Sequence, residues 1–111
     1  MKLSHEDHHE LSVLTLKGDL ASDETDRFRR AALERIEARI RDFVLDLENL
    51  ESIDSQGLET LLWLQEQCDE RLGQVRLAAC QEQMRDVLKM TRLAARFECC
   101  DSVESAIRSL G

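Results

Sequence analysis

The chain has 111 residues, 42% of them hydrophobic, so it has room for one domain with a single core and no more. Fifteen basic and 23 acidic residues give a formal net charge of −8, which argues against nucleic acid and anionic membranes as partners. No apolar run approaches the roughly 20 residues of a membrane span, and residues 1–10 lack the apolar stretch of a signal peptide. We therefore expect a single cytoplasmic domain over residues 1–111 that is not inserted in a membrane.

The first third of the sequence predicts two strands followed by a helix. Residues 11–16 form a short β-rich run closed by Gly18, and residues 2–6 are a weaker candidate for a partner strand. Ser22 is a plausible N-cap for the helix that follows, since acidic residues come directly after it. The apolar residues of this helix recur every fourth position, at Phe28, Ala32, Ile36 and Ile40.

The remaining elements alternate. Residues 43–47 (FVLDL) are nearly all apolar, as expected of an interior strand covered on both faces, and ENLES reads as a short connection after them. The later elements are predicted as a helix over 57–71, a strand over 75–80, a helix over 81–90, a strand over 97–100 and a final helix capped by Asp101 and Ser102. This order predicts an α/β fold, a small mixed sheet of four to five strands packed with about four helices.

The four cysteines, Cys68, Cys80, Cys99 and Cys100, are expected to be buried, reduced thiols that act as small hydrophobes, because nothing indicates a secreted disulfide framework. Cys99 and Cys100 are adjacent, so on a strand their side chains would face opposite ways. A joint metal site for this pair is therefore not expected.

The most informative segment is residues 44–58, a buried strand that leads into the polar turn Asp54-Ser55-Gln56-Gly57. Ser55 falls at or next to a helix N-cap, where its hydroxyl could simply accept a bond from a free backbone N–H. Gly57 permits close backbone approach or an unusual dihedral angle. Each of these features has a purely structural explanation as well as a functional one.

Three stretches resemble the STAS domain family, in particular the small single-domain bacterial anti-sigma factor antagonists. They are VLTLKGDL at 13–20, VLDL at 44–47 followed after six residues by DSQGL at 54–58, and VLKMTRL at 87–93 with Phe97 after it. The order and spacing of the three cover nearly the whole chain. Gln56, Ala21, Ser52 and Arg92 depart from residues that are common in the family, but they leave Asp54, Ser55 and Gly57 in place.

The resemblance implies partner switching. The unmodified antagonist binds an anti-sigma factor serine kinase, a histidine-kinase-like ATPase, and so frees a sigma factor; the kinase phosphorylates Ser55, and a serine phosphatase resets it. The chain itself would be a monomer or weak homodimer without catalytic activity, cofactor or metal. The expected contact residues are Asp54, Ser55, Gln56, Gly57, Glu59 and Trp63.

The helix opened by Ser55 is the expected docking element. Its apolar residues fall in one broad arc at Leu58, Leu61, Leu62, Leu64, Cys68 and Leu72. Trp63 falls nearly opposite this arc, and an outward tryptophan beside the switch serine is typical of an interface anchor. The alternative is that Trp63 packs under a neighbouring element.

Three other functions compete with this interpretation. STAS subunits also brace the ATPase of lipid-transporting ABC systems, where binding is constitutive and threonine is frequent at the position of Ser55. A serine hydrolase would need a G-x-S-x-G elbow and a nearby histidine, and Ser55 lacks the first glycine. Metal binding by His5, His8 and His9 is less plausible than a polar turn.

Overall fold

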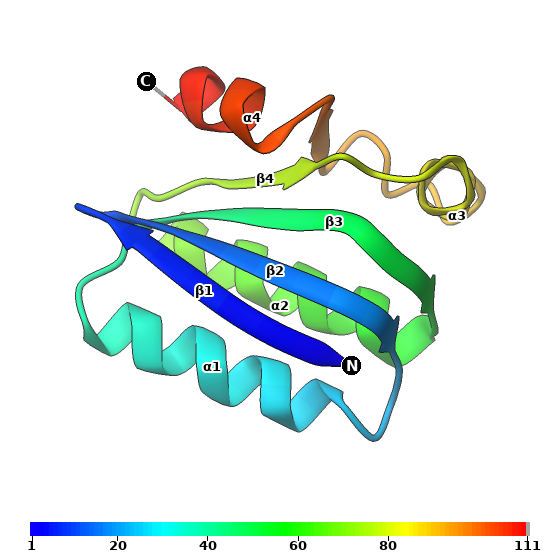
Figure 1. The fold of residues 1–111 in the computed structure, drawn as a ribbon, viewed down its shortest axis with the longest axis horizontal. Helices are drawn as coiled ribbons and strands as arrows, with labels where there is room; N and C mark the ends of the chain where they lie inside the picture. The colour runs from blue at the N-terminus through cyan, green and yellow to red at the C-terminus, as the bar shows by residue number, and fades with distance from the viewer. Residues whose placement is uncertain (111) are drawn as a thin grey trace.

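The computed structural model describes residues 1–110 and shows a five-stranded sheet with helices on both faces (Figure 1). In chain order the elements are β1 (Lys2–His8), β2 (Leu11–Leu20), α1 (Thr25–Glu37), β3 (Asp42–Ile53), α2 (Ser55–Glu70), β4 (Val75–Ala78), α3 (Glu82–Met90), β5 (Glu98–Cys100) and α4 (Val103–Leu110). The predicted order of strands and helices is confirmed.

The sheet is mixed, as predicted. Its strands are arranged β1-β2-β3-β4-β5, with β1 antiparallel to β2 and every other neighbouring pair parallel. Each parallel connection needs a crossover, and α1, α2 and α3 supply the three crossovers. The strand predicted from residues 43–47 is the central one, which explains its nearly continuous apolar sequence.

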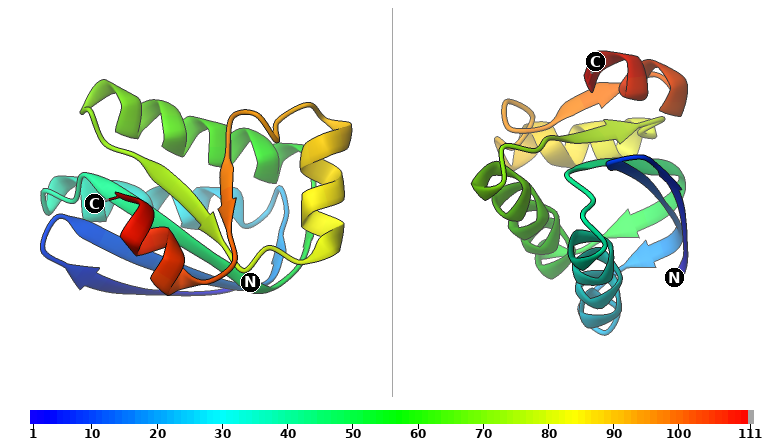
Figure 2. Two further views of the ribbon diagram at one scale, coloured as in Figure 1. Left: turned by 90° about the horizontal axis from the view of Figure 1, so that it is seen from above. Right: turned by 90° about the vertical axis from the view of Figure 1, so that its left-hand side faces the viewer.

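The helices divide the core into two unequal parts. Helices α1 and α2 cover one face of the sheet and α4 covers the other (Figures 1 and 2). Alternate side chains of the strands separate accordingly: Leu14 and Leu45 belong to the large cluster under α1 and α2, whereas Val13 and Val44 belong to the small cluster under α4. Helix α2 packs on the larger cluster, which fixes the position of its first turn relative to the sheet.

Strand β3 is longer than predicted. The segment ENLES, expected to be a connection, continues the strand to Ile53. The pairing with β2 shifts twice, between Thr15 and Lys17 and between Gly18 and Asp19, and each shift leaves an extra residue in β3. Such bulges break the alternation of inward and outward side chains, which is why the segment does not read as a strand.

Two predictions about helix ends are wrong. Helix α1 begins at Thr25 with Glu24 as its N-cap, so Ser22 does not cap it; instead the Ser22 carbonyl accepts a bond from Thr25 Oγ1 at 3.1 Å. Leu72 does not share the apolar arc of α2, because the helix ends at Glu70 and Leu72 has a positive φ of 62°. Its side chain is 88% exposed.

Candidate functional site at the start of helix α2

Asp54 caps α2 and ties its start to a distant loop. Its Oδ1 accepts a hydrogen bond from the Gly57 N–H at 2.8 Å, and its Oδ2 accepts one from the Ser22 N–H at 2.9 Å. The first bond satisfies an N–H that would otherwise lack a partner in the first turn. The second links α2 to the β2–α1 loop, 32 residues away in the sequence. Asp54 therefore holds the turn that carries Ser55.

Ser55 is the first residue of α2, and its side chain is exposed. Within the described residues, the hydrogen bonds of this turn are made by the Asp54 carboxylate and by backbone groups, not by the Ser55 hydroxyl. The N-cap role considered for Ser55 from the sequence thus belongs to Asp54. The hydroxyl is left facing solvent at the positive end of the helix dipole.

Gly57 is required by close packing. A Cβ atom at this position would lie 2.4 Å from the Leu20 carbonyl oxygen and 2.6 Å from Ile53 Cγ1. Only a residue without a side chain lets the first turn of α2 approach the ends of β2 and β3 this closely. Of the two explanations that the sequence leaves open for Gly57, close approach is the one the structure shows.

The surroundings of Ser55 are acidic. Asp19, at the end of β2, accepts a hydrogen bond from Ser52 Oγ at 2.6 Å, which gives a polar pairing role to one of the residues that depart from the family pattern. The exposed carboxylates around this end of the sheet are Asp19, Asp23, Glu51 and Glu59. The nearest cations, the Met1 amino group and Arg27, pair with Glu24 of the β2–α1 loop and leave these four carboxylates exposed.

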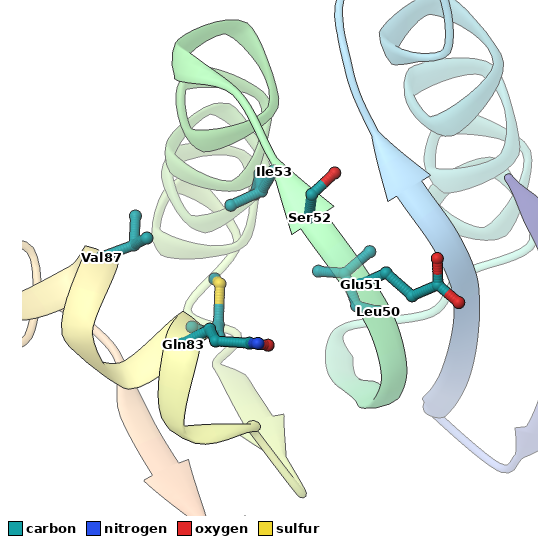
Figure 3. Close-up of a pocket in the computed structure, with 7 residues that line it drawn as sticks. Leu50, Glu51, Ser52, Ile53, Gln83 and Val87 are labelled. Carbon is teal, nitrogen blue, oxygen red and sulfur yellow. The ribbon is translucent and has the colours of Figure 1, made fainter.

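A small hollow lies beside the same end of the sheet, between the last part of β3 and helix α3 (Figure 3). It has a volume of about 40 Å³, and its lining residues are Leu50, Glu51, Ser52, Ile53, Gln83, Met84 and Val87. The contribution of α3 to this hollow was not predicted from the sequence. It depends on how α3 packs against the end of β3, next to the turn of Ser55.

Trp63 is less exposed than predicted. Its side chain is half-buried and packs against the main core, and the Arg29 guanidinium of α1 lies 5.8 Å from the centre of its ring. At this distance the cation and the ring attract each other. Trp63 therefore helps to pack α1 against α2, and its role as a contact for another protein stays a prediction. Gln56 and Glu59 are exposed on α2, as a docking surface requires.

The histidines lie away from Ser55. His8 pairs with Leu11 at the beginning of β2, whereas the turn of Ser55 packs on Leu20 at its other end. His5 lies in the middle of the exposed edge strand β1. This arrangement places no histidine beside Ser55 to act as its general base, which weighs against the hydrolase alternative. In residues 1–110, no group of three or more His, Cys, Asp or Glu side chains is placed to hold a metal ion.

Comparison with known proteins agrees with the geometry. The STAS domain family matches residues 2–106, nearly the whole chain. The chain belongs to the STAS domain family. A comparison with curated protein sequences finds no significant match.

Solved structures show how widely this STAS fold is shared. A putative anti-sigma factor antagonist from Thermotoga maritima superposes with a TM-score of 0.90 at 18% identity, covering 97% of this chain and 93% of that one. The Bacillus cell fate determinant SpoIIAA in its phosphorylated form gives 0.79 at 20% identity, covering 99% and 100%. A sulfate transporter family protein from Wolinella succinogenes gives 0.79 at 19% identity, covering 91% and 84%. At these identities the likeness establishes the fold of the STAS domain.

No helix among residues 1–110 of the STAS domain combines the length and apolar character that crossing a bilayer requires. The site is thus an exposed serine on a capped helix, surrounded by carboxylates and bordered by a small hollow. Such a site can bind another protein and accept a modifying group.

Proposed function

We propose that this STAS domain is an anti-sigma factor antagonist in a partner-switching pathway. It binds an anti-sigma factor serine kinase, a histidine-kinase-like ATPase, while Ser55 is unmodified, and it releases that kinase once Ser55 is phosphorylated. A serine phosphatase returns it to the binding form. The chain contributes the substrate hydroxyl and the binding surface, and the kinase contributes ATP and the catalytic groups. It is not itself an enzyme.

One observation carries this proposal: the Ser55 hydroxyl is exposed at the start of a helix whose N-cap role is already filled by Asp54. Because the hydroxyl supports no part of the fold, a kinase can reach it without opening the structure. Free backbone N–H groups and the helix dipole at this end also favour a negative group on Ser55. Phosphorylation is therefore compatible with the folded state.

The charge around the site supports loss of the partner upon phosphorylation. A phosphoryl group adds about −1.5 to −2 charges at neutral pH. The neighbouring exposed side chains of Asp19, Glu51 and Glu59 are also negative, so they do not neutralise the charge of the phosphoryl group. In an interface that fits a hydroxyl, the larger dianion would have to lose its water at a high cost in free energy.

The docking surface that we propose consists of the exposed start of α2 and the edge of the hollow between β3 and α3 beside it. Gln56 and Glu59 face solvent on α2 near Ser55, and Trp63 is half-buried farther along the helix. The turn formed by Asp54 and Gly57 fixes the position of the first turn of α2 and therefore the direction of these side chains. A partner that packs on this surface would cover Ser55.

The test is capture of histidine-kinase-like serine kinases from the source organism by the wild-type chain, Ser55→Ala and Ser55→Asp. We expect one kinase to be retained by the wild type and by Ser55→Ala and to be lost with Ser55→Asp, because only the last variant places a charge on the surface. Equal capture by all three proteins would contradict switching. It would instead favour constitutive binding, as in the ABC-transport alternative.

A further inference from the structure

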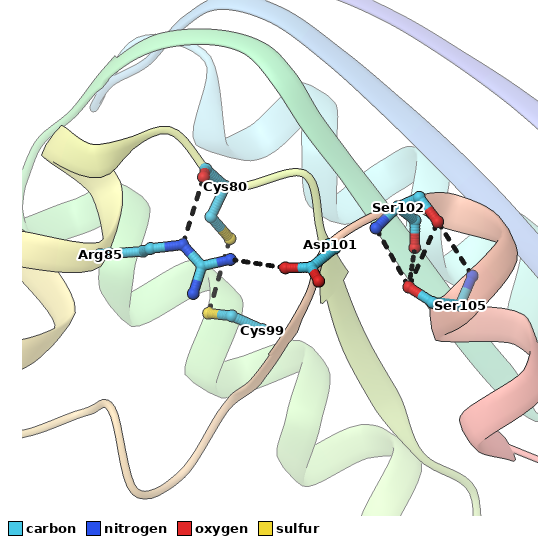
Figure 4. Close-up of polar contacts among 6 residues, drawn as sticks. All are labelled: Cys80, Arg85, Cys99, Asp101, Ser102 and Ser105. Atoms are coloured by element: carbon cyan, nitrogen blue, oxygen red, sulfur yellow. Dashed lines mark hydrogen bonds and ion pairs between the residues drawn. The ribbon is translucent and has the colours of Figure 1, made fainter.

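Cys80 and Cys99 lie side by side although 19 residues separate them. Their Sγ atoms are 3.5 Å apart, and the Cys80 thiol donates to the Cys99 sulfur (Figure 4). Cys99 is on β5, opposite Leu77 of β4, and Cys80 follows the end of β4. Ala79, with φ of 56°, turns the chain so that Cys80 faces back toward β5.

The two thiols differ in access to solvent. Cys80 is 8% exposed, whereas Cys99 is half-buried and lines a surface hollow of about 220 Å³. The other residues that line this hollow are Arg85, Leu88, Lys89, Ala94 and Phe97. A small polar molecule can therefore reach Cys99 from outside and meets Cys80 only behind it.

The groups that face the pair favour one thiolate, on Cys99. The hydrogen bond from Cys80 lowers the pKa of Cys99 to about 7, against the opposing effect of burial, and the Arg85 guanidinium lowers it further. The same bond, together with burial, raises the pKa of Cys80, so this residue keeps its proton. Arg85 is held in place by its bond to the Cys80 carbonyl at 3.4 Å and by Asp101 at 3.8 Å (Figure 4).

The other two cysteines lack this environment. Burial raises the pKa of Cys68 to about 12. Cys100 points to the opposite face of the sheet, where it packs in the small cluster under α4, as predicted from its adjacency to Cys99. Cys100 therefore serves as a matched control for Cys99, since it is the next residue on the same strand and is also half-buried.

We propose that Cys80 and Cys99 are a modification site for hydroperoxides, at which Cys99 is oxidised and Cys80 then closes a disulfide bond with it. Two sulfur atoms in contact, one open to a surface hollow and the other shielded, are the arrangement of a reactive and a resolving cysteine. The disulfide needs an S–S distance of about 2 Å, so the sulfurs have to approach by roughly 1.5 Å.

The chemistry balances with hydrogen peroxide as the oxidant. The Cys99 thiolate attacks one oxygen of the peroxide and breaks the O–O bond; the leaving hydroxide takes a proton and becomes water, and Cys99 becomes a sulfenic acid. The Cys80 sulfur then attacks the Cys99 sulfur, and its proton leaves with the sulfenic hydroxyl as a second water. Two thiols are oxidised by two electrons, and one peroxide is reduced to two waters.

The disulfide would join β5 to the residue that leads into α3. Helix α3 carries Gln83, Met84 and Val87, which form one side of the hollow next to the turn of Ser55. Oxidation would thus fix α3 beside the phosphorylation site. The oxidation itself does not depend on the proposed function, because it is read from the mass of the isolated chain.

The test is to treat the reduced wild-type chain with hydrogen peroxide at pH 7, to alkylate the remaining thiols and to map the peptides by mass spectrometry. We expect one intramolecular disulfide between Cys80 and Cys99, which a thiol reductant reverses. Before oxidation, Cys99 should react with iodoacetamide at least about tenfold faster than Cys68, because a far larger fraction of it is thiolate. Cys100→Ser should behave as the wild type.

Cys80→Ser should stop at the sulfenic acid of Cys99, which a dimedone-type probe captures. Oxidation of Cys100 ahead of Cys99, a disulfide with any other pairing, or oxidation of Cys99 to the sulfinic acid without a disulfide would overturn the proposal. The peptide map of the oxidised wild-type chain decides between these outcomes, so the test remains valid even if a variant fails to fold.

Discussion

Replacing Gly57 with alanine is expected to lower the free energy of unfolding by about 1–3 kcal/mol, the usual cost of forcing a methyl group into a filled space. The new Cβ would meet the Leu20 carbonyl oxygen at 2.4 Å, and a backbone oxygen held in a strand cannot move aside as a flexible side chain can. Either β2 or the first turn of α2 must shift. Urea denaturation followed by circular dichroism measures the change.

Gln56→Ala is the matched control, because Gln56 lies in the same turn but its side chain is exposed. It should leave the midpoint of unfolding nearly unchanged. Since the shift in Gly57→Ala also displaces Ser55, this variant should capture the kinase more weakly than its remaining folded fraction explains. Unfolding of Gly57→Ala at the wild-type urea concentration would show that the turn has more room than the structure gives it.

The second large effect is expected on binding. Phosphorylation of Ser55 should weaken the complex with the kinase by about 30-fold or more, because burying an unpaired charge in an interface costs about 2–5 kcal/mol. The melting temperature of the isolated chain should change by less than about 5 °C, since a negative group at a helix N-terminus is tolerated or slightly favourable. Calorimetric titration and thermal unfolding of the same phosphorylated sample measure the two effects.

Ser4→Asp provides the control for charge alone. Ser4 is exposed on the edge strand β1, and the variant adds negative charge to the chain away from α2. It should bind the kinase as the wild type does. A phosphorylated chain that melts far below the unmodified one would show that Ser55 supports the fold, and its loss of binding would then have another cause.

The sequence predicts the elements of this STAS fold well and some of their ends badly. Most of the strands and helices form runs with a recognisable pattern of apolar residues, so their existence and order can be read locally. The extension of β3 to Ile53 cannot, because two bulges shift its pairing with β2 and disturb the alternation of side chains. The start of α1 is also missed. Ser22 has the right chemistry for an N-cap, but its N–H donates to the Asp54 carboxylate and its carbonyl accepts from the Thr25 hydroxyl.

The position of Ser55 at a helix start is predictable, because the turn Asp54-Ser55-Gln56-Gly57 combines a capping residue with a glycine. What holds the turn is not predictable, since the bond between Asp54 and Ser22 spans 32 residues. The contact of Trp63 with Arg29 depends on how α1 packs against α2, and that of Cys80 with Cys99 depends on the turn at Ala79. These contacts arise from packing between elements rather than from any local pattern.

The most direct measurement of the central claim is the location of the phosphoryl group after incubation of the chain with its captured kinase and ATP. Peptide mapping by mass spectrometry should find one phosphate, on Ser55, and Ser55→Ala should accept none. Other exposed serines at the same end, Ser22 and Ser52, are the internal comparison. Phosphate on either of these, or equal labelling of the wild type and Ser55→Ala, would contradict the assignment of Ser55 as the switch.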